Sequence, residues 1–288
     1  MSSELIGLQC AGWRVKEKLG AGSYGDVFAV TKGTEERVLK VAKTFETFRI
    51  ESHIMRTVMT KSPRFSPTFF SSSTTPDTLF RGKDWLLMSR EGVSLEEIAD
   101  LHPEGMLSPD QALSVMHDIS RGLAVLHSSH FVHRDLKPDN ILISWSPNKT
   151  LFLLTDYGCS NSLDEHGLHL ILNPEPTFLY HSVDVASGRS YLFKDDLVAL
   201  MHIVLYLRNE PGLYSLNMQE RQKKKQLIIQ NVANISEFNG FLRAVCRFVT
   251  SCSRRDDKKK PKIPDYENLG KIITENKEFK TDVKVVVE

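Results

Sequence analysis

The residues at 133–140 have the types and the spacing that phosphoryl transfer needs. They read H-R-D-L-K-P-D-N and match the pattern H-R-D-L-x-x-x-N at every fixed position. The carboxylate of Asp135 can accept a hydroxyl proton, Lys137 can neutralise charge on a transferred phosphoryl group, and Asn140 can ligate a metal ion. We expect all three to be catalytic residues.

A second acidic side chain follows this motif. Asp156-Tyr157-Gly158 comes after an apolar segment at residues 151–154 and occupies the place of D-F-G, with tyrosine in the middle. An Asp-x-Gly sequence alone is usually a turn. Its place downstream of the motif instead favours a metal role, and we expect Asp156 and Asn140 to bind the Mg²⁺ that bridges the phosphates of ATP.

A glycine-rich turn near the N-terminus is the candidate for holding these phosphates. Residues 20–25 read G-x-G-x-x-G, and glycine lets backbone N–H groups approach phosphate oxygens closely. Alone, such a motif also fits a flexible loop or a dinucleotide-binding turn that runs into a helix. Here it runs into β-forming residues at 27–30, which favours a strand–turn–strand lid over ATP. The expected nucleotide contacts are Leu19, Gly20, Ala21, Gly22, Ser23, Tyr24, Gly25 and Val27.

A lysine and a glutamate complete the expected phosphate site. Lys40 lies on an expected strand and can hold the α- and β-phosphates if a carboxylate orients it, and Glu51 on the next helix is the candidate partner. Lys43 competes for the role of Lys40. Because Lys40 alternates inward with Val38 and Ala42, whereas Lys43 falls on the opposite face, the pattern favours Lys40.

Strands in the first third of the chain and helices in the rest must position these residues. Alternating and β-branched residues predict strands, of which the first three form an antiparallel meander. Apolar residues spaced by three and four predict helices, and Ser108-Pro109 is typical of a helix start. The expected strands lie around residues 13–16, 27–30, 37–42, 68–70 and 85–88, and the expected helices at 45–59, 108–126, 194–208 and 239–251.

The composition is that of a globular protein with no bias toward nucleic acid or membranes. The 288 residues carry a net formal charge of +1, and 41% of them are hydrophobic. The most apolar stretch, at 197–207, is far shorter than the ~20 residues that span a bilayer, and we expect no signal peptide. The four cysteines have neither CxxC nor zinc-ligand spacing, so we expect reduced thiols in the cytosol or nucleus.

From about Gly12 to Ile273 the chain resembles the protein kinase superfamily, and within it most closely the casein kinase 1 group, which includes the vaccinia-related and tau-tubulin kinases. F-R-I-E-S at 48–52 is similar to the group's helix with the partner glutamate and supports Glu51. G-V-S-L-E-E at 92–97 resembles its G-P-S-L-E-D, and I-P-D-Y-E-N-L at 263–269 its C-terminal P-D-Y-x-x-L. Most kinases have the sequence A-P-E near the end of the activation segment, and this group lacks it. The chain also lacks A-P-E, and residues 176–182 resemble the sequence that the group has in its place. The subfamily stays open, because D-Y-G resembles vaccinia-related kinases and H-R-D-L-K-P-D-N resembles casein kinase 1.

The resemblance implies roles that spacing alone does not assign. Met88 falls at the gatekeeper position, and residues 89–91 would form the hinge whose backbone meets adenine, so Met88 and Glu91 are expected nucleotide contacts. Thr177 is expected to shape the peptide-acceptor site beside the catalytic aspartate. Asp196 is expected to brace the catalytic loop from a buried helix.

One position departs from the casein kinase 1 pattern. That family has an arginine where this chain has Leu179, and the arginine helps form an anion pocket that favours acidic or pre-phosphorylated substrates. Leucine cannot bind an anion, so this preference is not expected here.

The motifs and the resemblance predict an α+β, two-lobed protein kinase fold. A small β-rich N-lobe with one main helix and a larger, mainly helical C-lobe would enclose an ATP cleft. We expect a single kinase domain over 1–288, with the N-lobe at about 12–88, the hinge at about 89–92, the C-lobe at about 93–275 and a tail at 276–288.

The expected function is Mg²⁺-ATP-dependent phosphorylation of serine and threonine on proteins, since Lys137 is typical of kinases with that specificity rather than tyrosine specificity. One alternative is an inactive pseudokinase that serves as an ATP-binding interaction module, although Lys40, Asp135 and Asp156 are all present. Another is a small-molecule phosphotransferase, against which the C-terminal match argues. We expect ATP, Mg²⁺ and protein substrates as partners, no nucleic acid or membrane as main partner, a monomer, and a location in the cytoplasm, the nucleus or both.

Overall fold

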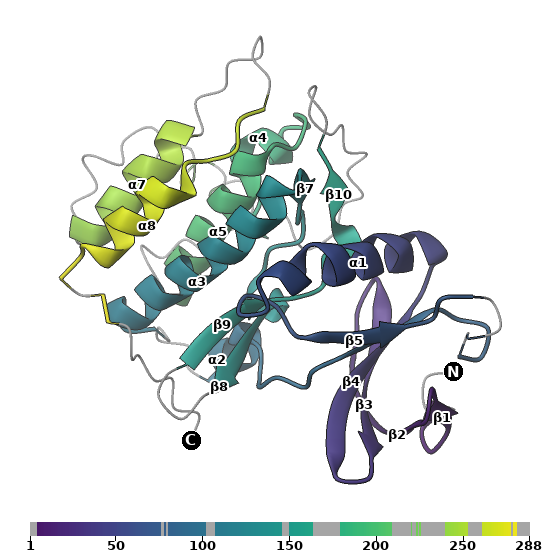
Figure 1. Ribbon diagram of the computed structural model, residues 1–288. Helices are drawn as coiled ribbons and strands as arrows, with labels where there is room; N and C mark the ends of the chain where they lie inside the picture. The colour runs from purple at the N-terminus through teal and green to yellow at the C-terminus, as the bar shows by residue number, and fades with distance from the viewer. Residues whose placement is uncertain are drawn as a thin grey trace.

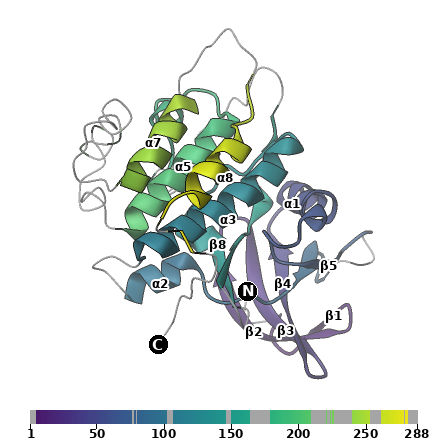
Figure 2. The same cartoon turned by 60° about the vertical axis from the view of Figure 1, so that its left-hand side comes forward.

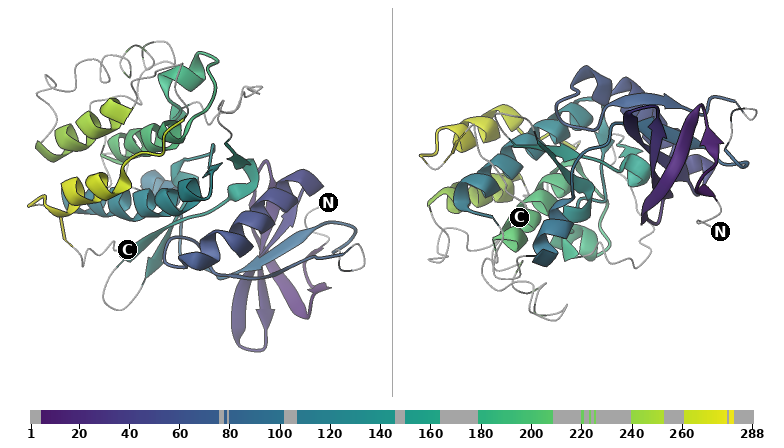
Figure 3. Two further views of the ribbon diagram at one scale, coloured as in Figure 1. Left: turned by 45° about the horizontal axis from the view of Figure 1, so that its top comes forward. Right: turned by 90° about the horizontal axis from the view of Figure 1, so that it is seen from below.

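The computed structural model has a β-rich N-terminal part and a helical C-terminal part (Figure 1). Most of the helices gather at one end of the molecule, and the largest sheet lies at the other end with α1 beside it (Figure 3). The structure describes residues 5–75, 78, 80–101, 107–145, 150–163, 179–208, 220, 223, 225, 240–252, 261–277 and 279–280.

A six-stranded antiparallel sheet dominates the N-terminal part. Its spatial order is β1-β2-β3-β4-β6-β5, so the three strands of the meander lie side by side and β6 inserts between β4 and β5. The strands are β1 (Gln9–Cys10), β2 (Trp13–Ala21), β3 (Gly25–Lys32), β4 (Glu35–Ala42), β5 (Phe69–Ser72) and β6 (Trp85–Met88).

The helix α1 (Phe45–Thr57) packs against this sheet (Figure 1). Its N-terminus is capped by Thr44, whose hydroxyl accepts the N–H of Thr47. Successive residues of β4 face opposite sides of the sheet. Val38 and Ala42 belong to the core cluster that contains the buried side chains of α1, whereas the residues that alternate with them pack on the other face. Lys40 therefore points toward α1.

The C-terminal part is a helical bundle around α3 (Pro109–Ser128), which packs against both α5 (Phe193–Leu207) and α8 (Tyr266–Thr274) (Figure 2). A capping box at Ser108 and Gln111 begins α3. The other helices are α2 (Leu95–Leu101), α4 (Val183–Ala186) and α7 (Gly240–Cys252).

Two short antiparallel ribbons connect the helices to the sheet and carry the motif residues. β7 (Phe131–Val132) pairs with β10 (Asn161–Ser162), and β8 (Ile141–Trp145) pairs with β9 (Thr150–Leu154). The segment 133–140 runs from β7 to β8, and Asp156 is the second residue after the end of β9. The two ribbons therefore bring the two acidic motifs into one region.

The expected elements are confirmed to within about two residues at each end, except that the strand expected at 13–16 continues to Ala21 as β2. The expected α+β class, with a β-rich N-terminal part and a mainly helical C-terminal part, is likewise confirmed. In the described part of the chain no helix combines the length and the apolar character needed to cross a bilayer. All four cysteines are free, and burial raises the pKa of the Cys246 thiol to about 12.

Gly92 is required where the segment after β6 meets β8. Its N–H donates to the carbonyl of Ile143 at 2.8 Å, and a Cβ at this position would lie 2.6 Å from that oxygen and 2.0 Å from the Trp145 ring. We predict that Gly92→Ala lowers the free energy of unfolding by about 1–3 kcal/mol, the usual cost of overpacking, measured by denaturant titration.

Gly270 in α8 is the matched control. A Cβ there would meet no atom within 4 Å, and alanine has a higher helix propensity than glycine. Gly270→Ala should therefore raise the free energy of unfolding by about 0.5–1 kcal/mol. If both substitutions change stability alike, the steric account of Gly92 is wrong.

Candidate active site

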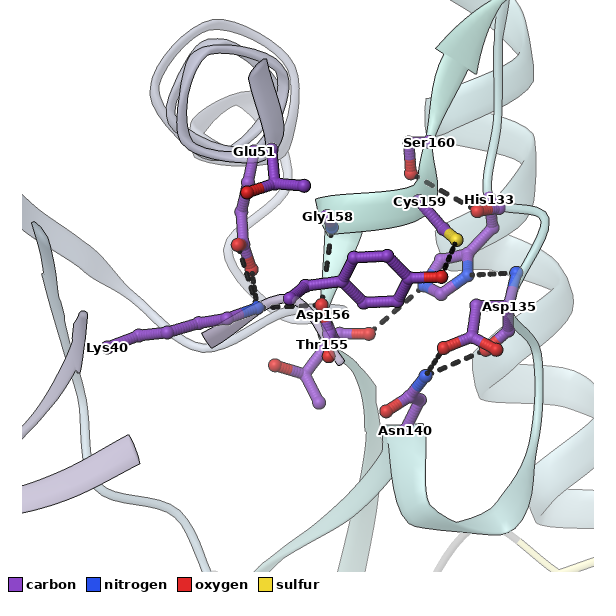
Figure 4. Close-up of polar contacts among 12 residues, drawn as sticks. Lys40, Glu51, His133, Asp135, Asn140, Thr155, Asp156, Gly158, Cys159 and Ser160 are labelled. Atoms are coloured by element: carbon purple, nitrogen blue, oxygen red, sulfur yellow. Dashed lines mark hydrogen bonds and ion pairs between the residues drawn. The ribbon is translucent and has the colours of Figure 1, made fainter. Parts of the chain in front are cut away.

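Lys40 lies between two carboxylates that come from different parts of the chain (Figure 4). Its Nζ is 2.8 Å from Glu51 Oε1 on α1 and 2.7 Å from Asp156 Oδ1 after β9. The helix α1 thus sits close enough to the sheet for the expected pair to form. Of the two lysines that the sequence left open, Lys40 makes this pair and Lys43 is exposed.

The three charges shift one another's pKa values. Burial opposes the charge of Lys40, but Asp156 and Glu51 prevail and hold the pKa of its ammonium above the ordinary value. Burial also opposes ionisation of Asp156, and Lys40 with the N–H of Gly158 lowers the pKa of that carboxyl. Burial raises the pKa of Glu51 to about 7 despite Lys40. Glu51 has the higher proton affinity because its side chain is 3% exposed and that of Asp156 is 24% exposed.

Asp135 is held in a defined orientation by its neighbours in the 133–140 loop. The Asn140 amide donates to the Asp135 carbonyl at 2.7 Å and to its carboxylate Oδ2 at 3.0 Å (Figure 4). The Lys137 ammonium is 3.3 Å from the same Oδ2. The pKa of Lys137 lies above its ordinary value because the charges of Asp135 and Asp139 outweigh its burial. Asp135 thus presents an oriented carboxylate beside a cation, as a base for a hydroxyl requires.

The loop itself is anchored to the buried carboxylate of Asp196 on α5. Asp196 Oδ2 accepts the N–H of His133 at 2.7 Å, and Oδ1 accepts the N–H of Arg134 at 3.0 Å. Arg134 has a φ of 72°, a conformation that a residue with a side chain adopts only when its surroundings hold it there. The structure therefore places Asp196 where the resemblance expected a brace.

The middle residue of Asp156-Tyr157-Gly158 points into the core. Tyr157 is fully buried, donates its hydroxyl to the Leu154 carbonyl at 3.0 Å and packs beside the ring of His133. The ring of His133 also contacts the carbonyl of Thr155 at 3.0 Å. Burial raises the pKa of the Tyr157 hydroxyl, which therefore stays protonated as a donor. These contacts link the catalytic loop to the segment that carries Asp156.

The glycine-rich turn rests on the same segment. Leu19 to Ala21 end β2, residues 22–24 form the turn, and Gly25 and Val27 begin β3. A Cβ on Gly158 would lie 2.8 Å from Tyr24 Cβ, so only glycine fits beneath this ring. The Cys159 thiol lies 2.6 Å from the Tyr24 hydroxyl. This contact was not expected, because nothing in the sequence pairs the residue after Gly158 with the turn.

Met88 and the hinge lie at the end of β6. Met88 is buried and pairs with Val38 of β4 and Phe69 of β5. Ser89 donates its hydroxyl to Glu91 and exchanges hydrogen bonds with the backbone of Thr68. Among the described residues, the peptide groups of 90 and 91 make no hydrogen bond with another backbone group. They are therefore available to a ligand that carries hydrogen-bond donors and acceptors along one edge.

The donor set near Asp156 fits a hard divalent cation. Because the Asn140 nitrogen donates to Asp135, the Asn140 amide oxygen is the atom with which Asn140 could hold the expected metal, together with the carboxylate of Asp156. No group of three or more His, Cys, Asp or Glu side chains suited to a metal occurs in the part of the chain that the structure describes. Two protein ligands leave the other positions to phosphate oxygens and water, as Mg²⁺ prefers in nucleotide sites.

The structure brings together most of the expected site residues. Lys40, Glu51 and Asp156 form one group of contacts, and Asp135 and Asn140 form a second group near it (Figure 4). Thr177 lies outside the described residues, so its expected contact stays a prediction. Leu179 is partly buried against the main core cluster.

The fold and these contacts are those of the protein kinase class. A family model described as "Protein kinase domain" matches residues 13–268, and the chain belongs to this family.

Several curated relatives of the chain are named as serine/threonine-protein kinases. It is similar to serine/threonine-protein kinase PknE of Mycobacterium tuberculosis (27% identity over 204 residues, 69% of this chain and 35% of the relative). It is also similar to serine/threonine-protein kinase pakG of Dictyostelium discoideum (27% over 250 residues, 84% and 20%). The chain therefore spans about a third or less of these curated relatives.

A solved structure titled "Structure of vaccinia related kinase 3" shares the fold, with a TM-score of 0.71 and 18% identity over 91% of this chain and 86% of that one. At this identity the likeness concerns the fold alone.

Glu96 belongs to the 92–97 segment that carried the resemblance, but it was not expected to take part in the site. Burial raises the pKa of its carboxyl to about 7, with further contributions from Asp139 and Asp100, and Lys137 opposes them. Its buried Oε2 has no hydrogen-bond partner among the described residues. Ionised Glu96 therefore destabilises the folded state.

We predict a pH-dependent effect of Glu96→Gln. Because the folded-state pKa is raised, Glu96 contributes stability below its ordinary pKa of 4.5 and loses that contribution as the pH rises through about 7. Glutamine cannot ionise, so the melting temperature of the variant relative to wild type should rise between pH 5 and pH 8, measured by thermal melts. A difference that is constant across this range would contradict the prediction.

Proposed function

We propose that the chain transfers the γ-phosphoryl group of Mg²⁺-ATP to serine and threonine hydroxyls of protein substrates. The observation that carries this proposal is the oriented carboxylate of Asp135, fixed by Asn140 and Lys137 next to the Lys40–Glu51–Asp156 cluster. An inactive relative usually lacks one of these groups, and this chain has all of them.

Each residue has a distinct part in the proposed reaction. Bound Mg²⁺-ATP supplies the activated phosphoryl group and neutralises its charge. Asp135 orients the acceptor hydroxyl and takes its proton as the new bond forms, and Lys137 stabilises the charge that develops on the phosphoryl oxygens. Asn140 and Asp156 supply the oxygen ligands for the metal. Lys40, kept cationic by its two carboxylates, is placed for the α- and β-phosphates.

The lid and the hinge account for the expected nucleotide contacts. The backbone N–H groups of residues 20–25 would lie over the phosphates, with Leu19 and Val27 on the flanking strands against the base. The free peptide groups at Glu91 and the buried Met88 would meet the adenine. Since Lys40 touches Asp156 and Tyr24 touches Gly158, binding of phosphates requires these contacts to rearrange.

The narrower assignment to the casein kinase 1 group is part of the proposal. It rests on the segments at 48–52, 92–97 and 263–269, and the fold likeness to a vaccinia-related kinase is compatible with it. We also propose that the protein acts in the cytoplasm, the nucleus or both, since its four cysteines are free thiols, as in a reducing compartment. A monomer is part of the same proposal.

A transfer assay tests the activity. Wild type, incubated with radiolabelled ATP and Mg²⁺, should label casein or itself on serine and threonine. Asp135→Asn should lower kcat by about 10²–10⁴-fold, the usual contribution of a general base, and Lys40→Met and Asp156→Asn should also abolish most labelling. Lys43→Met is the matched control, because Lys43 is exposed and makes no contact with Glu51, and its activity should equal that of wild type.

The same assay separates the alternative function. If wild type binds Mg²⁺-ATP, shown by a thermal shift, yet labels no protein, the chain is an interaction module and the proposed activity is wrong. Labelling that survives Asp135→Asn unchanged would contradict the role of Asp135.

A further inference from the structure

The tyrosine of the C-terminal motif at 263–269 has no part in the proposed reaction, yet it lies at the end of a path to the catalytic loop. Tyr266 begins α8, which packs against α3 (Figure 2). Its hydroxyl is 2.9 Å from Nδ1 of His127, near the end of α3, and the two rings meet edge to face. His127 is fully buried.

The other nitrogen of the same imidazole contacts the anchor of the catalytic loop. His127 Nε2 is 2.9 Å from Asp196 Oδ2, and this oxygen also accepts the N–H of His133. The second oxygen, Oδ1, accepts the N–H of Arg134 and the hydroxyl of Tyr191. Three side chains from α8, α3 and α5 thus form a continuous chain of hydrogen bonds that ends at the backbone immediately before Asp135.

The proton positions follow from this geometry. A carboxylate that accepts from three other donors is an ionised acceptor. Burial opposes the ionisation of Asp196, but the hydrogen bonds that it accepts, from His127 and the N–H of Arg134 among others, hold its pKa below the ordinary value. His127 must therefore donate from Nε2. Its Nδ1 then carries a lone pair when the ring is neutral, and the Tyr266 hydroxyl is the donor that it meets. Burial and the nearby charge of Asp196 raise the pKa of Tyr266 well above its ordinary value, so the hydroxyl keeps its proton.

The charged and titratable groups around these rings come from each packed element. Asp196 of α5 contacts the imidazole of His127. Tyr191, in the segment before α5, and His133, in the 133–140 loop, lie near the Asp196 carboxylate. Cys252 of α7 lies near Tyr266. None of them is an expected metal ligand.

We propose that Tyr266 is a positioning residue for the catalytic loop: its hydroxyl holds His127 as the neutral Nε2–H tautomer, which donates to Asp196 and keeps the carboxylate set for the N–H groups of His133 and Arg134. The effect on catalysis rests on the proposed kinase function, because Asp135 is the group that the loop presents. Arg134 has a strained φ, so a weaker anchor lets the loop relax and misplaces Asp135.

The first test reads the tautomer directly. In ¹⁵N-histidine NMR spectra, the His127 resonances are identified by their absence from His127→Phe, or from the milder His127→Gln if the first variant does not fold. Wild type should show a single neutral tautomer with an unprotonated Nδ1. Tyr266→Phe keeps the ring and removes only the hydroxyl, and it should give a mixture of tautomers or a protonated ring. An unchanged, single Nε2–H tautomer in Tyr266→Phe would overturn the proposal.

The second test measures catalysis. Tyr266→Phe should lower kcat by several-fold to about tenfold and leave the KM for ATP unchanged, since it acts on the loop and not on the nucleotide. Leu269→Ala is the control, because Leu269 is fully buried on α8 but is not in the hydrogen-bond chain. It should lower the melting temperature more than Tyr266→Phe while leaving the tautomer and kcat, measured well below unfolding, as in wild type.

A double-mutant cycle decides whether Tyr266 acts through His127. In the His127→Phe background, or in His127→Gln if needed, Tyr266→Phe should cause no further loss of kcat. Additive losses, or an equal loss of kcat in Leu269→Ala, would show a general loosening of α8 and overturn the proposal. A wild type that transfers no phosphoryl group would contradict the proposed function instead, and the NMR result would still decide the tautomer.

Discussion

The buried carboxylate of Asp196 is the constraint on which the catalytic loop depends. An ionised carboxylate without access to water is stable only when its oxygens are fully hydrogen-bonded, and here each oxygen accepts two donors. Two of the four donors are backbone N–H groups of the loop, one of them at a residue with positive φ. The charge of Asp196 therefore holds a loop conformation that local sequence preferences disfavour. Because the other two donors come from different segments, the loop is tied to the packing of the whole helical part.

A second charged cluster connects the N-terminal part to the C-terminal part. One ammonium, that of Lys40, lies between Glu51 on α1 and Asp156 after β9, so the sheet, the helix and the segment of the C-terminal part share a single interaction. The cluster has two carboxyl groups and one ammonium group. Burial opposes the second negative charge, and the result is the raised pKa of Glu51. A divalent cation and phosphates would change this balance. The position of α1 and the electrostatics of the phosphate site are therefore coupled.

The two clusters are joined through aromatic and backbone contacts rather than through further charges. The rings of His133 and Tyr157 pack side by side, and His133 contacts the carbonyl of Thr155, next to Asp156. Asp135 follows His133 in the loop, and Asp156 lies between Thr155 and Tyr157. The contacts of His133 therefore connect the positions of the two aspartates. The position of Tyr24 over Gly158 adds the glycine-rich turn to the same unit. The glycine-rich turn, the loop with Asp135 and the segment with Asp156 therefore contact one another through buried and half-buried groups.

The sequence by itself determined the fold class and most of the longer helices and strands, and it predicted the roles of Asp135, Asn140, Asp156, Lys40 and Glu51, because local periodicity and closely spaced motifs are written in contiguous residues. It pointed to Lys40 rather than Lys43 through alternation along one strand, and the contact with Glu51 agrees with that choice. Only the tertiary structure decided that Tyr266, His127 and Asp196 are neighbours, that Tyr24 lies on Gly158, and that Glu96 is driven toward protonation. These features depend on burial and on contacts between residues up to 139 positions apart, as for Tyr266 and His127. Spacing along the chain does not encode such contacts, since they arise when α3, α5 and α8 pack together.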